Sequence, residues 1–381
     1  MLAQKALHNA SLLFMCAAYQ APQRQTGRAN PRVAMSAYNG TFKPGGLAAR
    51  LPEQIGDMAQ ARETTMQQRT LGKSSLRVTP LAFGGNVFGW TVDEKTAFAL
   101  LDRCVAAGLN LIDTADVYSR WVPGNQGGES ETLIGRWLRH SGKRNQVVIA
   151  TKVGLDMGGE RTGLSAAHIE RSVDESLVRL QTDCIDLYQA HRDDPATPLE
   201  ETLEAFARLI KAGKVRCIGA SNYSGARLEQ ALGVSERLGL PRFETLQPLY
   251  NLLDRTGYEE DLEPVILRHQ VGVISYYGLA RGFLTGKYRS SADFSKSPRG
   301  QLAGAYLNER GKRVLAALDE VAAEHQATPG QIALAWLMAR PGMTAPIASA
   351  SSLAQLDEML GALSITLTAS AVTRLNEASR P

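Results

Sequence analysis

The sequence predicts a closed (β/α)8 TIM barrel, an α/β fold in which eight parallel strands alternate with helices. From about residue 75 onward, eight short apolar runs alternate with longer segments of helical periodicity. The runs are almost continuously apolar, which is typical of strands that a parallel sheet buries on both faces. Eight such units in roughly 300 residues also fit a barrel, whose usual size is about 250 residues plus insertions.

Each predicted strand is bounded by turn or helix signals. In chain order the strands are PLAFGG (80–85), NLIDTA (110–115), VVIATK (147–152), DLYQAH (186–191), VRCIGAS (215–221), ETLQPL (244–249), VGVISYY (271–277) and APIASA (345–350). An open doubly wound sheet is the alternative fold. The sequence disfavours it because no GxGxxG motif follows the first strand and because polar residues end many strands, not only those at one switch point.

The helices between the strands carry their own boundary signals. In TPLEETLEAFARLIKAG we expect Thr197 to cap the first turn, Pro198 to take the first helical position, Glu200 to complete a capping box and Gly213 to end the helix. Apolar residues recur on one face of this helix and of the helix in SAAHIERSVDESLVRL: Leu199, Leu203, Phe206 and Leu209 in the first, and Ile169, Val173, Leu177 and Leu180 in the second. Both faces are expected to pack against the sheet.

The N-terminal segment differs in composition from the rest of the chain. Residues 1–52 contain six basic residues and no acidic residue, so 36 basic and 38 acidic residues remain and residues 53–381 carry a net charge of −2. The basic pI therefore gives no indication of nucleic-acid binding. We expect residues 1–65 to form a poorly ordered extension and residues 66–381 to form the barrel. A signal peptide and a transit peptide are weaker alternatives for this extension.

Composition and cysteine content narrow the class of protein further. With 44% hydrophobic and 21% charged residues, the chain is expected to be soluble and globular. The apolar run ASLLFMCAA (10–18) is too short to cross a bilayer, for which roughly 20 residues are needed. The four cysteines form no CxxC or Cys/His spacing, so we expect buried thiols, no metal site and a cytoplasmic location.

Polar residues stand at the carboxyl ends of the predicted strands. In chain order they are Asn86, Asp113, Lys152, His191, Ser221, Asn222, Gln247, Tyr276, Tyr277, Ser349 and Ser351. The carboxyl ends of barrel strands converge on the face where active sites lie. Titratable residues of complementary type on one rim are hard to explain by packing, so the sequence predicts a site there.

Several of these strand ends lie in motifs of a known family. NLIDTADVY, VVIATKVG, DLYQAH, IGASNYS and GLARGFLTGKY, in this order and spacing, resemble the aldo-keto reductases, from about Met66 to the C-terminus. The resemblance is strongest to bacterial members related to potassium-channel β subunits. It implies a (β/α)8 barrel that binds a nicotinamide cofactor without a Rossmann fold and reduces a small-molecule carbonyl.

The resemblance also implies a catalytic tetrad of Asp113, Tyr118, Lys152 and His191. Tyr118 would protonate the carbonyl oxygen during hydride transfer, and Lys152, held by Asp113, would lower its pKa from about 10 by stabilising the phenolate. His191 would hydrogen-bond the carbonyl oxygen. Asp116 has no role in this scheme, and we expect it to be a solvated loop residue or a local turn-former.

The cofactor site is carried over from the same resemblance. The residues implied are Gly85, Asn86, Asp113, Ser221, Asn222, Gln247, Tyr276, Leu279, Arg281, Lys287, Ser349, Ser351, Gln355 and Glu358. Among them, Ser221, Asn222 and Gln247 would bind the carboxamide, and Tyr276 would stack on the nicotinamide. Leu279, Arg281 and Lys287 would lie at the pyrophosphate, where Arg and Lys form charge-assisted hydrogen bonds.

Two departures from the family pattern concern this cofactor site. Tyr277 and Gly278 stand where the family commonly has Ser-Pro, which puts the loop geometry in doubt. Basic residues that often bind the 2′-phosphate of NADPH are missing, because Ser349, Ser352 and Gln355 stand at those positions, and Met359 replaces an asparagine. We expect NADPH as the cofactor with a weakened preference, which leaves NADH as an alternative.

The predicted substrate-binding residues surround the catalytic ones. They are Trp90, Tyr118, Trp121, His191 and Arg192, under a segment (289–313) that we expect to act as a lid. The predicted function is NADPH-dependent reduction of an aldehyde or ketone, including bulky or xenobiotic ones. The alternatives are NAD-dependent oxidation of an alcohol or sugar, and a cofactor-sensing regulatory subunit. The sequence leaves the oligomeric state and the natural substrate open.

Overall fold

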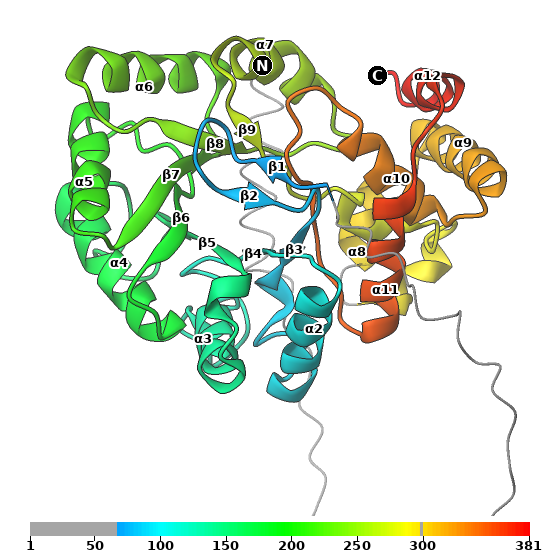
Figure 1. Cartoon of the computed structure of the whole chain (residues 1–381). Helices are drawn as coiled ribbons and strands as arrows, with labels where there is room; N and C mark the ends of the chain where they lie inside the picture. The colour runs from blue at the N-terminus through cyan, green and yellow to red at the C-terminus, as the bar shows by residue number, and fades with distance from the viewer. Residues whose placement is uncertain (1–66, 298–299) are drawn as a thin grey trace, which may run out of the picture. The chain divides into compact units, whose positions relative to one another are not determined.

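Eight parallel strands curve into a closed barrel with helices around it (Figure 1), which confirms the predicted fold. The computed structural model describes residues 67–297 and 300–381, so the prediction for residues 1–65 lies outside the described residues. The strand order is β10-β3-β4-β5-β6-β7-β8-β9. Backbone bonds from Ile347 to Ser275 (2.8 Å) and from Thr344 to Val273 (2.9 Å) join the two ends of the sheet and close the barrel.

All eight predicted strands are present, mostly shorter than their apolar runs. The strands of the barrel are β3 (Ala82–Gly84), β4 (Leu111–Asp113), β5 (Val148–Val153), β6 (Ile185–Ala190), β7 (Val215–Ser221), β8 (Phe243–Gln247), β9 (Gly272–Val273) and β10 (Ile347–Ala348). A separate antiparallel pair, β1 (Arg69–Thr70) and β2 (Arg77–Val78), precedes them.

Helices follow the strands around the outside of the barrel. The α-helices are α2 (Glu94–Ala106), α3 (Glu129–Ser141), α4 (Ala166–Leu180), α5 (Leu199–Lys211), α6 (Gly225–Leu238), α7 (Glu263–His269), α8 (Gly300–Ala303), α9 (Glu309–His325), α10 (Pro329–Met338), α11 (Leu353–Gly361) and α12 (Ala369–Ala378). Shorter turns are the 3-10 helices η1 (Gly85–Val87), η2 (Arg144–Gln146), η4 (Ala280–Thr285), η5 (Ser291–Lys296), η6 (Gly304–Tyr306) and η7 (Ala362–Ser364), and the π-helix η3 (Gly257–Leu262). No helix among the described residues is long and apolar enough to cross a membrane.

The alternation of side chains along each strand separates two cores. Ile149 and Val153 of β5 point outward into the core between sheet and helices, whereas Ala150 points into the barrel. The β1–β2 hairpin contributes Leu71 and Val78 to the inner core and fills the amino-terminal end of the barrel. Lys152, on the same inward register as Ala150, therefore lies at the carboxyl end, where polar groups replace apolar ones.

The start of α5 differs from its predicted cap. Thr197 does not cap the helix, because its hydroxyl donates to Asp194 (2.7 Å), and Pro198 is the N-cap residue with no side-chain bond. Glu200 does not complete a capping box and pairs with Arg237 (2.8 Å). Gly213 (φ +74°) does follow the end of the helix, as predicted. A nearby carboxylate competes for the threonine hydroxyl, and this competition is invisible to a local cap pattern.

Two further predictions are modified. Cys104 and Cys217 are buried free thiols, but Cys184 is only half-buried, and Cys16 lies outside the described residues. The segment predicted as a lid contains η5, α8, η6 and the first turn of α9 within its described part, so it is built from short helical turns. Whether it moves stays a prediction.

Candidate active site

Strand register brings the catalytic candidates together at the carboxyl end of the barrel. Asp113 pairs with Ala150 in the sheet, so Lys152, two residues further on the same face of β5, lies one layer above it. The backbone amide of Thr114 continues the pairing with Ala150 (2.8 Å). The chain then turns at Ser119 (φ +71°), whose hydroxyl donates to the carbonyl of Phe88 (2.6 Å). An earlier turn, closed by the bond from the Tyr118 amide to the Ala115 carbonyl (3.2 Å), brings the Tyr118 phenol to Lys152.

The ammonium group of Lys152 is the centre of the site. Its Nζ donates to Asp113 Oδ2 (2.8 Å), to the carbonyl of Thr114 (2.8 Å) and to the phenol oxygen of Tyr118 (2.9 Å). The Lys152 side chain is 0% exposed and that of Asp113 is 2% exposed. All three protons of the ammonium group are directed at oxygen atoms, which fixes Tyr118 relative to the buried ion pair.

Asp113 has its own hydrogen-bond partners. Tyr118 Oη donates to Asp113 Oδ2 (3.2 Å), and Gln247 Nε2 donates to the other oxygen, Oδ1 (2.8 Å). Burial lowers the pKa of Lys152 and Asp113 opposes this effect, so the carboxylate keeps the lysine charged. Gln247, expected at the cofactor carboxamide, thus holds the Asp113 carboxylate in this structure.

The pKa of Tyr118 is shifted in the direction opposite to the expected one. Burial and the adjacent Asp113 carboxylate raise the pKa of Tyr118 well above its ordinary value, whereas Lys152 was expected to lower it. The main reason is that burial disfavours the charged phenolate; the Asp113 carboxylate, to which the phenol donates, adds to this effect. Tyr118 is therefore a neutral phenol.

His191 completes the predicted tetrad beside Tyr118. Its backbone amide bonds to Val153 (2.8 Å), and its ring lies edge-on to that of Tyr118, with 6.1 Å between centroids. Burial, Lys152 and Arg192 lower the pKa of His191 well below 6.5. Its Nδ1 is buried with no hydrogen-bond partner among the described residues. His191 is thus a neutral imidazole whose ring can serve a ligand.

Asp116 is not the solvated residue that the sequence suggested. It is 2% exposed, and its Oδ1 has no partner among the described residues. Burial, and then the carboxylate of Glu131, raise the pKa of Asp116 well above its ordinary value. Glu131 is itself held by Thr151 and Arg179, each at 2.6 Å. Helices α3 and α4 cover this loop, which the loop's own sequence could not indicate.

The residues expected at the nicotinamide form a continuous hydrogen-bonded chain. Tyr276 Oη donates to Asn222 Oδ1 (2.8 Å), and Asn222 Nδ2 donates to Ser221 Oγ (3.0 Å) and to the carbonyl of His191 (3.0 Å). Ser221 Oγ donates to the carbonyl of Gln247 (2.8 Å). Asn222 has a positive φ of 56°, which asparagine tolerates better than most residues. The ends of β6, β7, β8 and β9 are thereby linked.

The loop after Tyr276 carries the candidates for phosphate binding. Leu279 precedes η4, and the guanidinium of Arg281 lies over the ring of Tyr277 at 4.9 Å. Arg281 Nε is buried without a hydrogen-bond partner among the described residues, and Lys287 is exposed. A half-buried guanidinium with a free donor and an exposed ammonium fit the phosphates of a nicotinamide cofactor.

The remaining cofactor candidates lie around β3, β10 and α11. Ser349 Oγ donates to Asn86 Oδ1 (2.7 Å), and a Cβ at Gly85 would meet the carbonyl of Asp113 at 3.0 Å, so this strand end is closely packed. Gln355 accepts bonds from the amide (2.9 Å) and hydroxyl (3.0 Å) of Ser351. Glu358 is exposed and accepts a bond from Thr328 (2.8 Å). No Lys or Arg lies between residues 341 and 373, in agreement with the missing basic clamp.

Aromatic rings border the site on the substrate side. Trp90 and Trp121 contact edge to face with 5.8 Å between centroids, and Trp121 lies 6.2 Å from Tyr118. Arg192 is half-buried, and its charge contributes to the lowered pKa of His191. The five predicted substrate-binding residues are thus neighbours, whereas the described residues contain no cluster of side chains suited to a metal ion.

Sequence reasoning missed two contacts in this region. The carbonyl of Thr114 binds Lys152, and the side chain of Asn251 binds the carbonyl of Tyr277 (3.0 Å). A backbone acceptor has no residue-type signal. Asn251 lies four residues after the end of β8, so its position gave no strand-end signal like that of Asn222, which directly follows β7.

A buried lysine–carboxylate pair, a phenol and an imidazole lie together at the mouth of a (β/α)8 barrel, a set of groups suited to acid–base chemistry in an oxidoreductase. The model of the Aldo/keto reductase family matches residues 80–380, and the chain belongs to this family.

Curated relatives agree with this assignment. The chain is 36% identical to "Uncharacterized oxidoreductase YrpG" of Bacillus subtilis over 82% of this chain and 95% of the relative. It is 33% identical to "Probable voltage-gated potassium channel subunit beta" of Arabidopsis thaliana, covering 79% and 92%. It is also 33% identical to "Protein tas" of Escherichia coli, covering 79% and 94%. The predicted resemblance is confirmed, and the chain is an NAD(P)H-dependent oxidoreductase.

Proposed function

We propose that this protein uses NADPH to reduce the carbonyl group of an aldehyde or ketone, with Tyr118 as the general acid. The observation that carries the proposal is the set of three bonds from Lys152 to Asp113, Thr114 and Tyr118. They hold a phenol in a fixed position beside a buried cation. A phenolate formed there would be stabilised by that cation at the moment of proton transfer.

The chemistry divides between cofactor and protein. Bound NADPH would supply a hydride to the carbonyl carbon. Tyr118 donates its proton to the carbonyl oxygen, which completes the two-electron reduction to an alcohol. Lys152 stabilises the resulting phenolate, and Asp113 keeps Lys152 charged and oriented. His191, as a neutral imidazole, donates a hydrogen bond to the oxygen and fixes its direction.

Tyr118 is a neutral phenol, since burial and then the Asp113 carboxylate raise its pKa. The same four residues would serve reduction and the reverse oxidation, so the reductive direction is proposed from the family and not from this pKa. Trp90 and Trp121 beside Tyr118 support a substrate with a bulky or aromatic group.

The choice of cofactor and the location of the protein are less constrained. Arg281 and Lys287 support binding of the cofactor phosphates. The absence of Lys and Arg between residues 341 and 373 reduces the expected selectivity for the 2′-phosphate. NADPH stays our prediction because it is the cofactor that this family commonly uses, and NADH is the alternative. The cytoplasmic location also stays a prediction.

Cofactor titration followed by a substrate screen tests this function. Purified protein is titrated with NADPH and with NADH while tryptophan fluorescence quenching is followed, and NADPH consumption is then measured with aromatic aldehydes and ketones. We expect NADPH binding and reduction that depends on Tyr118. Tighter NADH binding, with turnover of alcohols only, would refute the reductive NADPH function.

A regulatory role is a second candidate because one of the relatives is called a probable potassium channel β subunit. A cofactor-sensing subunit would bind the nicotinamide tightly and turn over slowly. Rapid steady-state reduction of several carbonyl compounds would argue against it, whereas tight binding with only a single turnover would favour it.

A further inference from the structure

The loop that carries the phosphate-binding candidates has an unusual backbone. Tyr277, Ala280 and Arg281 have φ values of +55°, +46° and +58°. Residues with side chains seldom adopt this left-handed region, and they remain there only where the surrounding structure holds them. Tyr277 and Arg281 both have long side chains, for which a positive φ is unfavourable.

The side chain of Asn251 holds the carbonyl of Tyr277. Asn251 is 0% exposed and follows β8 in the loop 248–256. Its Nδ2 donates to the Tyr277 carbonyl (3.0 Å) and to Asp254 Oδ2 (2.8 Å), while its Oδ1 accepts from the amides of Leu253 (2.8 Å) and Asp254 (3.0 Å). The Tyr277 carbonyl also accepts from the amide of Ala280 (2.7 Å). Asn251 thus fixes the peptide at the start of the left-handed stretch.

Asp254 connects the same point to a second segment. Its Oδ2 accepts the bond from Asn251 and another from the hydroxyl of Tyr306 (2.7 Å), which is the last residue of η6. This turn lies in the described part of the segment 289–313. This carboxylate oxygen therefore joins Asn251, whose side chain holds the loop after β9, to the segment before α9.

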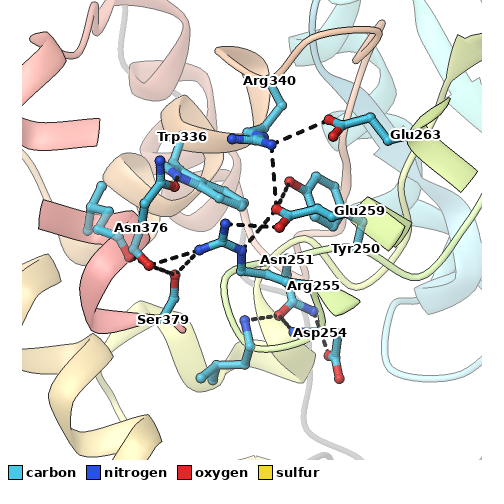
Figure 2. Close-up of polar contacts among 12 residues, drawn as sticks. Tyr250, Asn251, Asp254, Arg255, Glu259, Glu263, Trp336, Arg340, Asn376 and Ser379 are labelled. Carbon is cyan, nitrogen blue, oxygen red and sulfur yellow. Dashed lines mark hydrogen bonds and ion pairs between the residues drawn. The ribbon is translucent and has the colours of Figure 1, made fainter. Parts of the chain in front are cut away.

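Residue Arg255 anchors this arrangement to the C-terminal helices. Arg255 lies at the centre of the network in Figure 2, with two bonds to Glu259 (2.9 and 3.0 Å) and bonds to the Asn376 carbonyl (3.0 Å) and Ser379 Oγ (2.7 Å). Its guanidinium lies over the ring of Trp336 at 5.5 Å. Arg255, the residue after Asp254 in the chain, is thus tied to α10 and α12.

We propose that Asn251 and Asp254 are positioning residues for the cofactor: they hold the Tyr277 peptide in the left-handed conformation that places Arg281 and its neighbours at the cofactor phosphates. This proposal rests on the proposed function, since it assigns residues to the binding of the same nicotinamide cofactor. Without the bond from Asn251, the Tyr277 peptide relaxes toward an ordinary conformation, and the cofactor must restore the loop when it binds.

A double-mutant cycle on NADPH affinity tests the proposal. Asn251→Ala should weaken NADPH binding about tenfold in the wild-type background, as expected for a lost hydrogen bond that restrains a strained peptide. Glycine adopts a positive φ without cost, so in the Tyr277→Gly background the same substitution should weaken binding less than about threefold. Equal losses in the two backgrounds would mean that Asn251 supports the fold in general, and this outcome would overturn the proposal.

Two further variants keep the test decisive if Asn251→Ala folds poorly. Tyr306→Phe removes only the hydroxyl that binds Asp254, and NADPH should dissociate about threefold faster in stopped-flow fluorescence. Tyr250→Phe is the matched control: it removes one hydroxyl bond, to Glu259 (2.7 Å), in the same network but off the path to Tyr277.

The control should keep the wild-type dissociation rate. Equal NADPH dissociation rates in Tyr306→Phe and Tyr250→Phe would overturn the proposal, whether both rates are raised or both match the wild type. Failure of the wild-type protein to bind either nicotinamide cofactor would overturn the proposed function as well, so the two failures are distinguishable.

Discussion

Replacing Lys152 by methionine should damage stability and activity by separable mechanisms. The Lys152–Asp113 pair is buried, with side chains 0% and 2% exposed. Removing one partner of such a pair leaves an uncompensated buried charge and costs about 3–5 kcal/mol. At about 2 °C per kcal/mol in a domain of this size, the melting temperature should fall by roughly 6–10 °C.

Activity should fall further than stability explains. Without the ammonium group, the phenolate of Tyr118 has no cation, so reduction should drop by a factor of about 100–10,000 at temperatures where the variant is folded. The double variant Asp113→Asn/Lys152→Met buries no charge, and it should recover most of the melting temperature while it stays inactive.

Thermal unfolding and NADPH-consumption assays on the same preparations make the comparison. Lys143→Met is the control, because Lys143 pairs with Asp102 (2.6 Å) at a partly exposed position and should cost less than about 2 °C. The reasoning is refuted if Lys152→Met melts with the wild type, or if the double variant regains activity along with its stability.

Three other substitutions or truncations give independent checks. Tyr118→Phe should reduce turnover by a factor of about 100–10,000 and leave cofactor affinity nearly unchanged, and substantial residual turnover would remove Tyr118 as the acid. The pKa of His191 lies well below 6.5 in the folded protein, so the unfolded chain binds a proton there first. The free energy of unfolding should therefore fall as the pH drops below 6.5. His191→Gln should reduce that loss by up to about 1.4 kcal/mol per pH unit in urea unfolding; a parallel pH profile would contradict it. Removing residues 1–65 should shift the melting temperature by no more than about 2 °C, and a larger drop would show that they stabilise the barrel.

Sequence reasoning predicted those features that depend on local pattern. The eight apolar runs indicated the eight strands, and their carboxyl ends indicated the positions of Asp113 and Lys152, because strand alternation and register fix both. The helix cap at Thr197 failed since Asp194, three residues earlier, binds its hydroxyl.

Features that depend on tertiary cover could not be predicted in this way. An aspartate in a loop is expected to be exposed, but Asp116 is buried because residues of α3 and α4 lie close to it. The direction of the Tyr118 pKa shift depends first on how deeply the phenol is buried and then on the adjacent Asp113 carboxylate, and neither can be inferred from residue type. The role of Asn251 depends on a carbonyl 26 residues away.

The closure of the barrel has a consequence for how it opens. The two strands on either side of the joint, β9 and β10, are only two residues long, whereas β5, β6 and β7 have six or seven. The joint between these short strands leads to Tyr276 and Ser349, two residues that we expect to contact the cofactor. A cofactor that contacts both Tyr276 and Ser349 would restrain the joint between β9 and β10. Amide exchange at residues 273–275 and 344–347 should therefore slow more than elsewhere in the barrel when NADPH binds. Tighter cofactor binding would then go together with greater local stability of the joint between β9 and β10.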